Sequence, residues 1–177
     1  MKVDGLTKLR ACSAAVEWAR GQKSRQVAWE ACERGDWMLW LLGTCAGPDG
    51  SRKRKPLAMC AVDVAKLALP YAGKNRAVCL RVYRAVKAWH EGQASIEDVR
   101  FAADAAYAAS AAASAAADAS ADAADAAYAA SAAASAAADA SAAATATYAA
   151  ASAASRSNTL AKAADIVRKH YPKCPRF

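Results

Sequence analysis

Residues 102–155 read AADAAYAASAAASAAADASADAADAAYAASAAASAAADASAAATATYAAASAAS, and this stretch decides the fold of the chain. Of its 54 residues, 36 are alanine, and the others are only Asp, Ser, Tyr and Thr. Alanine has the highest intrinsic helix propensity, because its side chain loses no rotamer freedom and hides no polar group when a helix forms. We therefore predict an all-α protein, a multi-helix bundle whose C-terminal half is rich in alanine.

The stretch also contains an internal repeat of 21 residues. Six polar residues recur at this spacing: Asp104, Tyr107, Ser110, Ser114, Asp118 and Ser120 return as Asp125, Tyr128, Ser131, Ser135, Asp139 and Ser141. Because 21 residues are three heptads, both copies present these groups on the same side of a slightly underwound helix. The remaining face consists mostly of methyl groups, which let helix backbones approach closely. The repeat therefore predicts a packing element and indicates no active site.

The length of the repeat leaves two arrangements open. A single helix from residue 95 to 155 would be about 90 Å long at a rise of 1.5 Å per residue, whereas a compact domain of this size has a radius of gyration of about 16 Å. Ser120 and Ser141 lie off the main polar stripe at equivalent points, and serine is a good N-cap. We favour shorter antiparallel helices that turn at these serines. One long helix remains the alternative, because the stretch contains no Gly or Pro.

Apolar periodicity and turn residues predict further helices on both sides of this stretch. They are expected at residues 7–20, 25–34, 37–42, 56–70 and 76–90, from Ser95 into the alanine-rich stretch, and at 159–170. Expected boundary residues are Gly21 as a left-handed cap, Ser24 and Asp36 as N-caps, Gly43 as a stop, and Ser95 with Asp98 as a capping box. The core candidates of helix 76–90 are Val78, Leu80, Val82, Val86 and Trp89. We predict one domain over residues 1–177, with a Trp-containing part (1–94), the repeat helices (95–155), and a last helix with a basic tail (156–177).

Charge is unevenly distributed along the chain. Residues 1–100 hold 18 basic and 10 acidic side chains, whereas residues 101–155 hold five Asp and no base. The overall charge of +8 favours anionic partners such as nucleotides, nucleic acid or acidic proteins. The start MKVDGLTKLR has no apolar core of a signal peptide, and each Asp at a membrane centre costs about 2.5–3.5 kcal/mol. We expect a cytoplasmic protein that does not enter a membrane.

Motifs for chemistry are absent from the sequence. The six cysteines include no CxxC pair, and there are only two histidines, so we expect reduced thiols and no metal site. The sequence contains no GxSxG, P-loop, HExxH or paired-carboxylate motif. We therefore predict a protein that is not an enzyme and needs no cofactor.

Three groups of residues are candidate binding sites. Arg52, Lys53, Arg54 and Lys55 follow a glycine-rich loop and are expected either to hold phosphates or to remain a solvated loop. Trp37 and Trp40 share one helix face and are expected either in the core or as anchors for a base or a partner. Tyr107 and Tyr128, with Asp104 and Asp125, either line a groove or supply bulk to an alanine helix.

Three segments carry a resemblance to a known family. DWMLWLLG (36–43), CAVDVAKLALPY (60–71) and AVKAWHEGQASIEDVRFAADAA (85–106) resemble an alanine-rich family of bacteria and their phages, whose members are labelled immunity proteins. In that family, too, a Trp-containing segment and an ALP-ending helix precede a long alanine run. The resemblance covers about residues 15–155. It implies a helical, non-enzymatic interaction protein.

Two functions of different classes follow from these observations. The first is a binding protein that neutralises a partner protein, a toxin or a host defence protein. The second is a protein that sequesters an anionic nucleotide, or binds nucleic acid, through the basic loop. Under either function a methyl-rich face left in water would favour a homo-oligomer. An ice-binding helix is disfavoured, because residues 102–155 offer only Thr145 and Thr147 instead of a regular threonine row.

Overall fold

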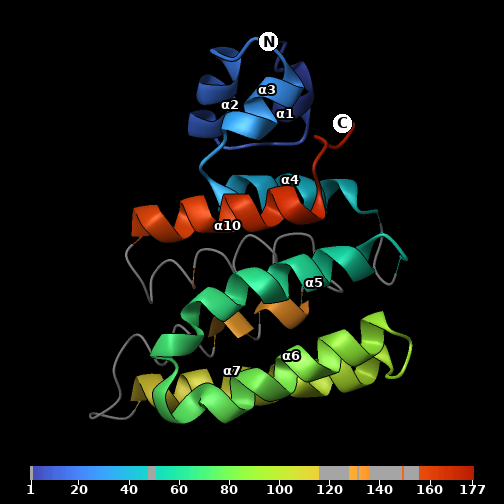
Figure 1. The fold of residues 1–177 in the computed structure, drawn as a ribbon, viewed down its shortest axis with the longest axis vertical. Helices are drawn as coiled ribbons and strands as arrows, with labels where there is room; N and C mark the ends of the chain where they lie inside the picture. Colours follow the sequence, from blue (N-terminus) through green and yellow to red (C-terminus); the bar gives the residue numbers. More distant parts are fainter. Residues whose placement is uncertain (1, 48–50, 116–127, 131, 136–148, 150–155) are drawn as a thin grey trace.

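The computed structural model describes residues 2–47, 51–115, 128–130, 132–135, 149 and 156–177, and every regular element within these ranges is helical (Figure 1). The prediction of an all-α bundle is confirmed. The named helices are α1 (Asp4–Lys8), α2 (Ser13–Arg20), α3 (Arg25–Ala31), α4 (Gly35–Cys45), α5 (Arg54–Ala65), α6 (Arg76–His90), α7 (Ile96–Ala115) and α10 (Arg156–His170). Two 3₁₀ turns, Lys66–Tyr71 and Gly73–Asn75, connect α5 to α6.

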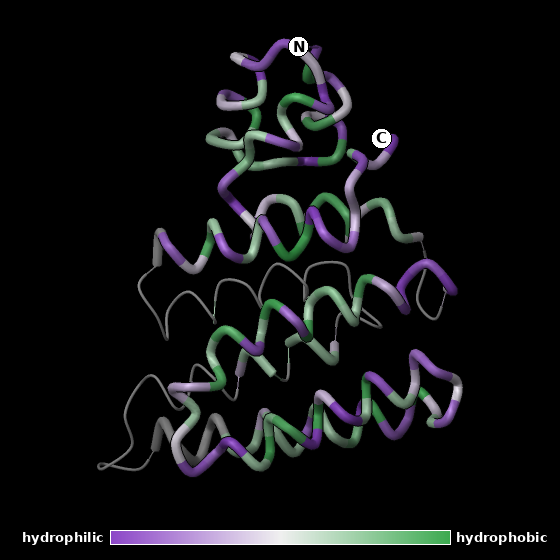
Figure 2. Tube along the Cα trace, in the orientation of Figure 1, coloured by the Kyte–Doolittle hydropathy of each residue, from purple (hydrophilic) through white to green (hydrophobic). Residues whose placement is uncertain are grey.

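The helices are stacked in layers along the long axis of the molecule (Figure 1). The short helices α1–α3 form an N-terminal lobe at one end. Below this lobe α4 packs against α10, α5 packs against α10 and α6, and α6 packs against α7 at the far end. Figure 2 shows green, hydrophobic stretches along α4 and α5, the helices between these outer layers. Among the described helices, none has the length and apolar character needed to cross a membrane.

The alanine-rich stretch folds back on itself. The ring centroids of Tyr107 and Tyr128 lie 6.3 Å apart, whereas 21 residues of one continuous helix would separate them by about 32 Å. The alternative of one long helix is therefore wrong. The expected turns at Ser120 and Ser141 lie outside the described residues.

Eight of the described alanines in this stretch pack inward, whereas Ala108 is exposed. Those buried in the hydrophobic core are Ala103, Ala106, Ala129, Ala130, Ala132, Ala133, Ala134 and Ala149. At these positions the methyl groups are covered by the same chain. These buried methyl groups need no second copy of the chain to cover them. The homo-oligomer therefore stays a prediction.

The helix expected at residues 7–20 is wrong, because the chain forms α1 and α2 there. Arg10 has φ of 61°, and a residue in this left-handed conformation cannot continue a right-handed helix. Gly21, expected as a left-handed cap, has φ of −71° instead.

The expected ends of the tryptophan-containing helix are also wrong. Asp36 lies inside the first turn of α4, which begins at Gly35, and the helix continues past Gly43 to Cys45. Gly35 has no Cβ, and α10 packs directly against it at the first residue of α4. The start of this helix is therefore determined by packing and not by a side-chain cap.

Boundaries encoded by local hydrogen bonds are confirmed. The Ser24 hydroxyl accepts a hydrogen bond from the Val27 amide at 3.2 Å, which caps α3. The Asp98 amide donates to the Ser95 hydroxyl at 3.1 Å, and the Asp98 carboxylate accepts from the Ser95 amide at 2.8 Å. These two bonds form the expected capping box before α7.

Helix α6 has the expected bounds, and its core face is partly as predicted. Val82, Val86 and Trp89 are buried, whereas Val78 is only half-buried and Leu80 is exposed. Cys79 and Tyr83 are buried on the same helix. They share the face of Val82 and Val86 through the three-and-four spacing of a helix.

A hydrogen-bonded contact joins α5 to α10. Asp63 accepts a hydrogen bond from Lys66 at 2.8 Å, and His170 Nε2 lies 2.9 Å from the same carboxylate. Burial by itself raises the pKa of Asp63, but the hydrogen bonds from Lys66 and His170 outweigh it and lower the pKa below the usual value. The carboxylate is therefore charged at neutral pH and can hold the two helices together.

Candidate functional site

The basic run does not form a four-cation surface. Arg54 is 4% exposed and donates two hydrogen bonds to the Gly47 carbonyl, at 3.2 and 2.8 Å. Lys55 donates to the Trp89 carbonyl at 2.8 Å and lies 5.2 Å from its ring centroid. Both cations thus bind structural carbonyls, and only Arg52 and Lys53 are exposed. The prediction that all four residues form a phosphate site is therefore wrong, because Arg54 and Lys55 are bound within the protein.

The tyrosine pair is brought together on the surface. Tyr107 is 59% exposed and Tyr128 38% exposed, with rings in tilted contact. Asp104 is exposed on α7, one turn from Tyr107. Asp125 lies outside the described residues. The described part of this candidate site is an aromatic contact at the surface.

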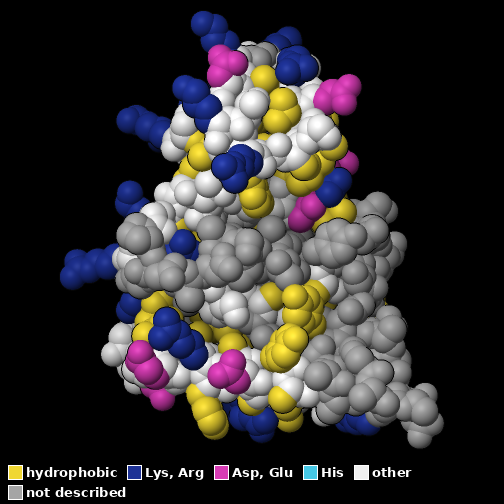
Figure 3. All heavy atoms as spheres, turned by 180° about the vertical axis from the view of Figure 1, so that it is seen from behind, with side chains coloured by type: hydrophobic (Ala, Val, Ile, Leu, Met, Phe, Trp, Pro, Cys, Tyr) yellow, Lys and Arg dark blue, Asp and Glu magenta, His cyan; other side chains and the backbone are white. Residues whose placement is uncertain are grey.

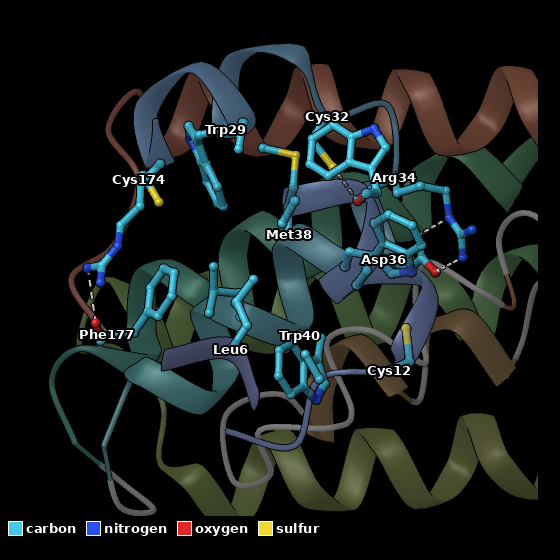
Figure 4. Close-up of a pocket in the computed structure, with 18 of the residues that line it drawn as sticks. Leu6, Cys12, Trp29, Cys32, Arg34, Asp36, Met38, Trp40, Cys174 and Phe177 are labelled. Atoms are coloured by element: carbon cyan, nitrogen blue, oxygen red, sulfur yellow. Dashed lines mark hydrogen bonds and ion pairs between the residues drawn. The ribbon is translucent and has the colours of Figure 1, made fainter. Parts of the chain in front are cut away.

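Trp37 and Trp40 are half-buried on α4 and line a cavity of about 570 Å³ between the N-terminal lobe, α4 and the C-terminal tail (Figure 4). Its walls are mostly aromatic and aliphatic. They include Leu6 from α1, Arg10 and Cys12 from the segment between α1 and α2, Ala15 and Trp18 from α2, Arg25 and Trp29 from α3, Cys32, Arg34, Asp36 and Met38 near the start of α4, and Cys174 and Phe177 from the tail. This cavity is the candidate functional site.

The C-terminal tail is fastened to α3 and closes one end of the cavity. The Gln26 side chain donates to the Pro172 carbonyl at 3.2 Å and accepts from the Cys174 amide at 3.0 Å. The Trp29 indole donates to the Tyr171 carbonyl at 2.8 Å. Because these bonds fix the tail along its length, its last aromatic side chain is held at a defined place.

Phe177 forms the end wall (Figure 4). Arg25 donates to the Phe177 main-chain oxygen at 3.0 Å, and its guanidinium lies 4.5 Å from the ring centroid. On the side of α1, a Cβ on Gly5 would lie 2.9 Å from this ring. Glycine at position 5 therefore leaves the room that Phe177 needs.

Arg34 and Asp36 form the opposite end of the cavity (Figure 4). Two nitrogens of Arg34 donate to the two carboxylate oxygens of Asp36, at 2.9 and 2.6 Å. The same guanidinium lies 4.4 Å from the Trp37 ring, and Trp18 packs at 6.1 Å on Trp37. The bidentate hydrogen bond also raises the pKa of Arg34. This ion pair fixes the orientation of the tryptophan face.

Three thiols line the cavity, those of Cys12, Cys32 and Cys174, and two of them have raised pKa values. Burial raises the pKa of the Cys32 thiol, and it raises the pKa of Cys174 to about 11. The thiols of Cys32 and Cys174 are therefore protonated at neutral pH and are weak nucleophiles. Asp36 is bound by Arg34, and no histidine is among the lining residues. In the ranges that the structure describes, no three His, Cys, Asp or Glu side chains are grouped to hold a metal ion.

Sequence reasoning found two of the wall residues and missed the others. Trp37 and Trp40 were identified by their shared helix face, but Arg10, Trp18 and Phe177 come from separate segments. A signal existed for Trp18, since a tryptophan on a short amphipathic helix needs a packing partner. No sequence signal gives the backbone conformation of Arg10.

No protein-family model, curated protein or solved structure matches this chain, so the resemblance to immunity proteins stays a prediction.

Proposed function

We propose that this protein is a non-enzymatic binding protein that sequesters a small ligand in the tryptophan-lined cavity. The observation that carries the proposal is the cavity itself. Its volume of about 570 Å³ lies within the roughly 300–1,000 Å³ typical of ligand sites, which are mostly apolar with a few placed polar groups. We therefore keep the sequestering function predicted from the sequence, but assign the binding site to Trp37 and Trp40 instead of the basic loop.

Three indoles make the wall suited to a planar ligand. Trp18, Trp37 and Trp40 are half-buried and line the cavity. Unlike Trp29, whose indole binds the tail, they have no hydrogen-bond acceptor within the described residues. Their ring faces can stack on an aromatic ligand and their N–H groups can donate to it, with aromatic contacts contributing about 0.5–1.5 kcal/mol each.

Ala15→Phe is expected to block the cavity. Ala15 lines it, so a phenyl ring at this position would occupy the space that a ligand needs. With phenylnaphthylamine as a neutral aromatic probe, we expect at least about tenfold weaker binding, the loss of roughly 1.4 kcal/mol. The measurement is energy transfer from tryptophan to the probe in a titration.

Ala14→Phe is the matched control, because Ala14 is the preceding residue on α2, is exposed and does not line the cavity. This variant should bind the probe as the original protein does. Equal binding by the Ala15 and Ala14 variants, with both folded by circular dichroism, would place the probe elsewhere and contradict the proposed site.

A second function, neutralisation of a partner protein, is favoured by an exposed aromatic surface. Phe101 is 80% exposed on α7, and Tyr107, six residues further along this helix, is exposed and in ring contact with Tyr128. Figure 3 shows hydrophobic side chains gathered at the surface of the molecule. Exposed aromatic side chains are frequent anchors of protein interfaces. Since α7 carries three acids and one base in Ile96–Ala115, the fitting partner has a basic surface, such as a nucleic-acid-binding toxin or defence protein.

Phe101→Ser is expected to abolish such a complex without unfolding the protein, because the phenyl ring is almost fully in water. The control Val27→Ser removes an exposed apolar side chain of α3, far from α7 in sequence. Native mass spectrometry of protein from cells that naturally make it should show a partner at fixed stoichiometry, lost only with Phe101→Ser. A complex that survives this change, or the absence of any protein partner, would reject the second function.

A further inference from the structure

We propose that the cavity selects a ligand with a negative charge next to an aromatic ring, and that Arg10 binds this charge. The inference rests on the proposed ligand-binding function and names the class of ligand. Carboxylate, sulfonate and phosphate share the required chemistry, since each presents two oxygens to a guanidinium.

The charged groups around the cavity are unbalanced. Three guanidinium groups, those of Arg10, Arg25 and Arg34, line it with a single side-chain carboxylate, that of Asp36. Both oxygens of Asp36 already accept hydrogen bonds from Arg34. The side-chain charges that line the site are therefore positive in sum, which favours an anion over a cation.

The guanidinium of Arg10 differs from those of Arg25 and Arg34, because it makes no hydrogen bond or ring contact in the described part of the chain. Arg34 binds Asp36 and stacks on Trp37, and Arg25 binds and stacks on Phe177. Arg10 is exposed, and it pairs with no carboxylate in the described part of the chain. Its planar set of donors is thus available to a ligand at the cavity.

The backbone holds Arg10 in an uncommon conformation. Its φ of 61° is the only positive value at a non-glycine residue among the described residues. The Arg10 amide donates to the Thr7 carbonyl at 3.0 Å, and the next amide, that of Ala11, donates to the Leu6 carbonyl at 3.0 Å. These two bonds form a Schellman motif, in which the residue after the C-cap of a helix adopts the left-handed conformation, so Arg10 ends α1. The turn between α1 and α2 therefore fixes the point from which this side chain reaches the ligand.

The polar groups of the wall are mainly donors. The indole N–H groups of Trp18, Trp37 and Trp40 have no acceptor in the described ranges, and the Asp36 carboxylate is occupied by Arg34. A ligand rich in acceptors satisfies these donors, whereas a ligand rich in donors would leave them unpaired. Hydrogen bonding and charge thus favour the same class, an aromatic anion.

Two probes that differ by one anionic group test the inference. Anilinonaphthalene sulfonate is an aromatic anion, and phenylnaphthylamine has the same ring system without the sulfonate. We expect Arg10→Gln to weaken binding of the sulfonate about tenfold, the size of one charge-assisted hydrogen bond. Binding of phenylnaphthylamine should change less than about twofold, because apolar contacts are retained. Arg10→Lys, which keeps the charge, should restore part of the sulfonate affinity.

Arg52→Gln is the control, since Arg52 is an exposed cation outside the cavity. It should leave both affinities unchanged. If Arg10→Gln weakens both probes equally, or neither, the charge-binding role of Arg10 is overturned while the cavity remains a ligand site. If neither probe binds the original protein, the proposed function fails together with the inference.

Discussion

Gly35→Ala is expected to destabilise the folded protein by about 3 kcal/mol or more, beyond the roughly 1–3 kcal/mol of ordinary overpacking. A Cβ at this position would lie 2.5 Å from Ala163 Cβ, 2.7 Å from Ala164 N and 2.8 Å from Ala163 C. Two of these atoms belong to the backbone of α10, which cannot move aside as a flexible side chain can. The added methyl group must therefore push α4 and α10 apart. Urea denaturation measures the change in the free energy of unfolding.

Gly21→Ala is the matched control for this prediction. Gly21 has φ of −71°, which alanine adopts readily, and the nearest atom to its added Cβ is the Trp18 oxygen at 3.5 Å. Since alanine restricts the unfolded chain more than glycine does, we expect no loss of stability or a gain of about 0.4–1 kcal/mol. Similar effects of the two substitutions would show that α4 and α10 are not in such close contact.

Gly35 also shows where sequence reasoning stops. From the sequence it marks the end of one helix and precedes Asp36, an expected N-cap, because glycine and aspartate have these local preferences. In the structure it begins α4 and lies against Ala163 and Ala164 of α10. The contact joins residues about 130 positions apart, and no local pattern encodes it. In the sequence, the contact is reflected only in the small size of the residues that make it, a glycine at position 35 and two alanines at 163 and 164.

Local signals gave correct predictions where the deciding contacts are local. The Ser24 cap of α3, the Ser95–Asp98 box and the bounds of α6 depend on residues within one or two turns. The basic run shows the opposite case. Arg54 and Lys55 bind the carbonyls of Gly47 and Trp89, and a count of charges cannot distinguish such structural cations from free ones.

The candidate cavity was only partly predictable for the same reason. Trp37 and Trp40 lie three residues apart on one helix, so their common face is readable from the sequence. The opposite walls are supplied by the α1–α2 turn and by the tail, which returns to α3 after α10. Because these segments are distant in sequence, no periodic pattern of residues predicts the cavity that they form.

Arg168→Met is expected to loosen the attachment of the N-terminal lobe to α10. The Arg168 guanidinium donates from one nitrogen to the Cys32 carbonyl at 2.7 Å and to the Trp29 carbonyl at 3.3 Å. These carbonyls lie at the C-terminal end of α3, where a cation is favoured by the helix dipole. Methionine keeps most of the apolar stem but leaves the carbonyls without this donor. Since hydrogen bonds to charged groups contribute about 1.5–3 kcal/mol, we expect a loss of about 2 kcal/mol and faster amide hydrogen exchange in α3.

The neighbouring substitution Lys169→Met separates this effect from a general loss of charge, because Lys169 is exposed on the same helix. Asp165→Asn removes only the exposed ion pair with Arg168, and such pairs contribute about 0–1 kcal/mol. If faster exchange in α3 follows from Arg168→Met but not from these two changes, the carbonyl contacts hold the lobe in place. Equal exchange in all three variants would mean that the lobe is held by the tail bonds of Gln26 and Trp29 instead. Because Trp29 and Cys32 also line the cavity, the same contacts of Arg168 connect the packing of α10 to the shape of the candidate site.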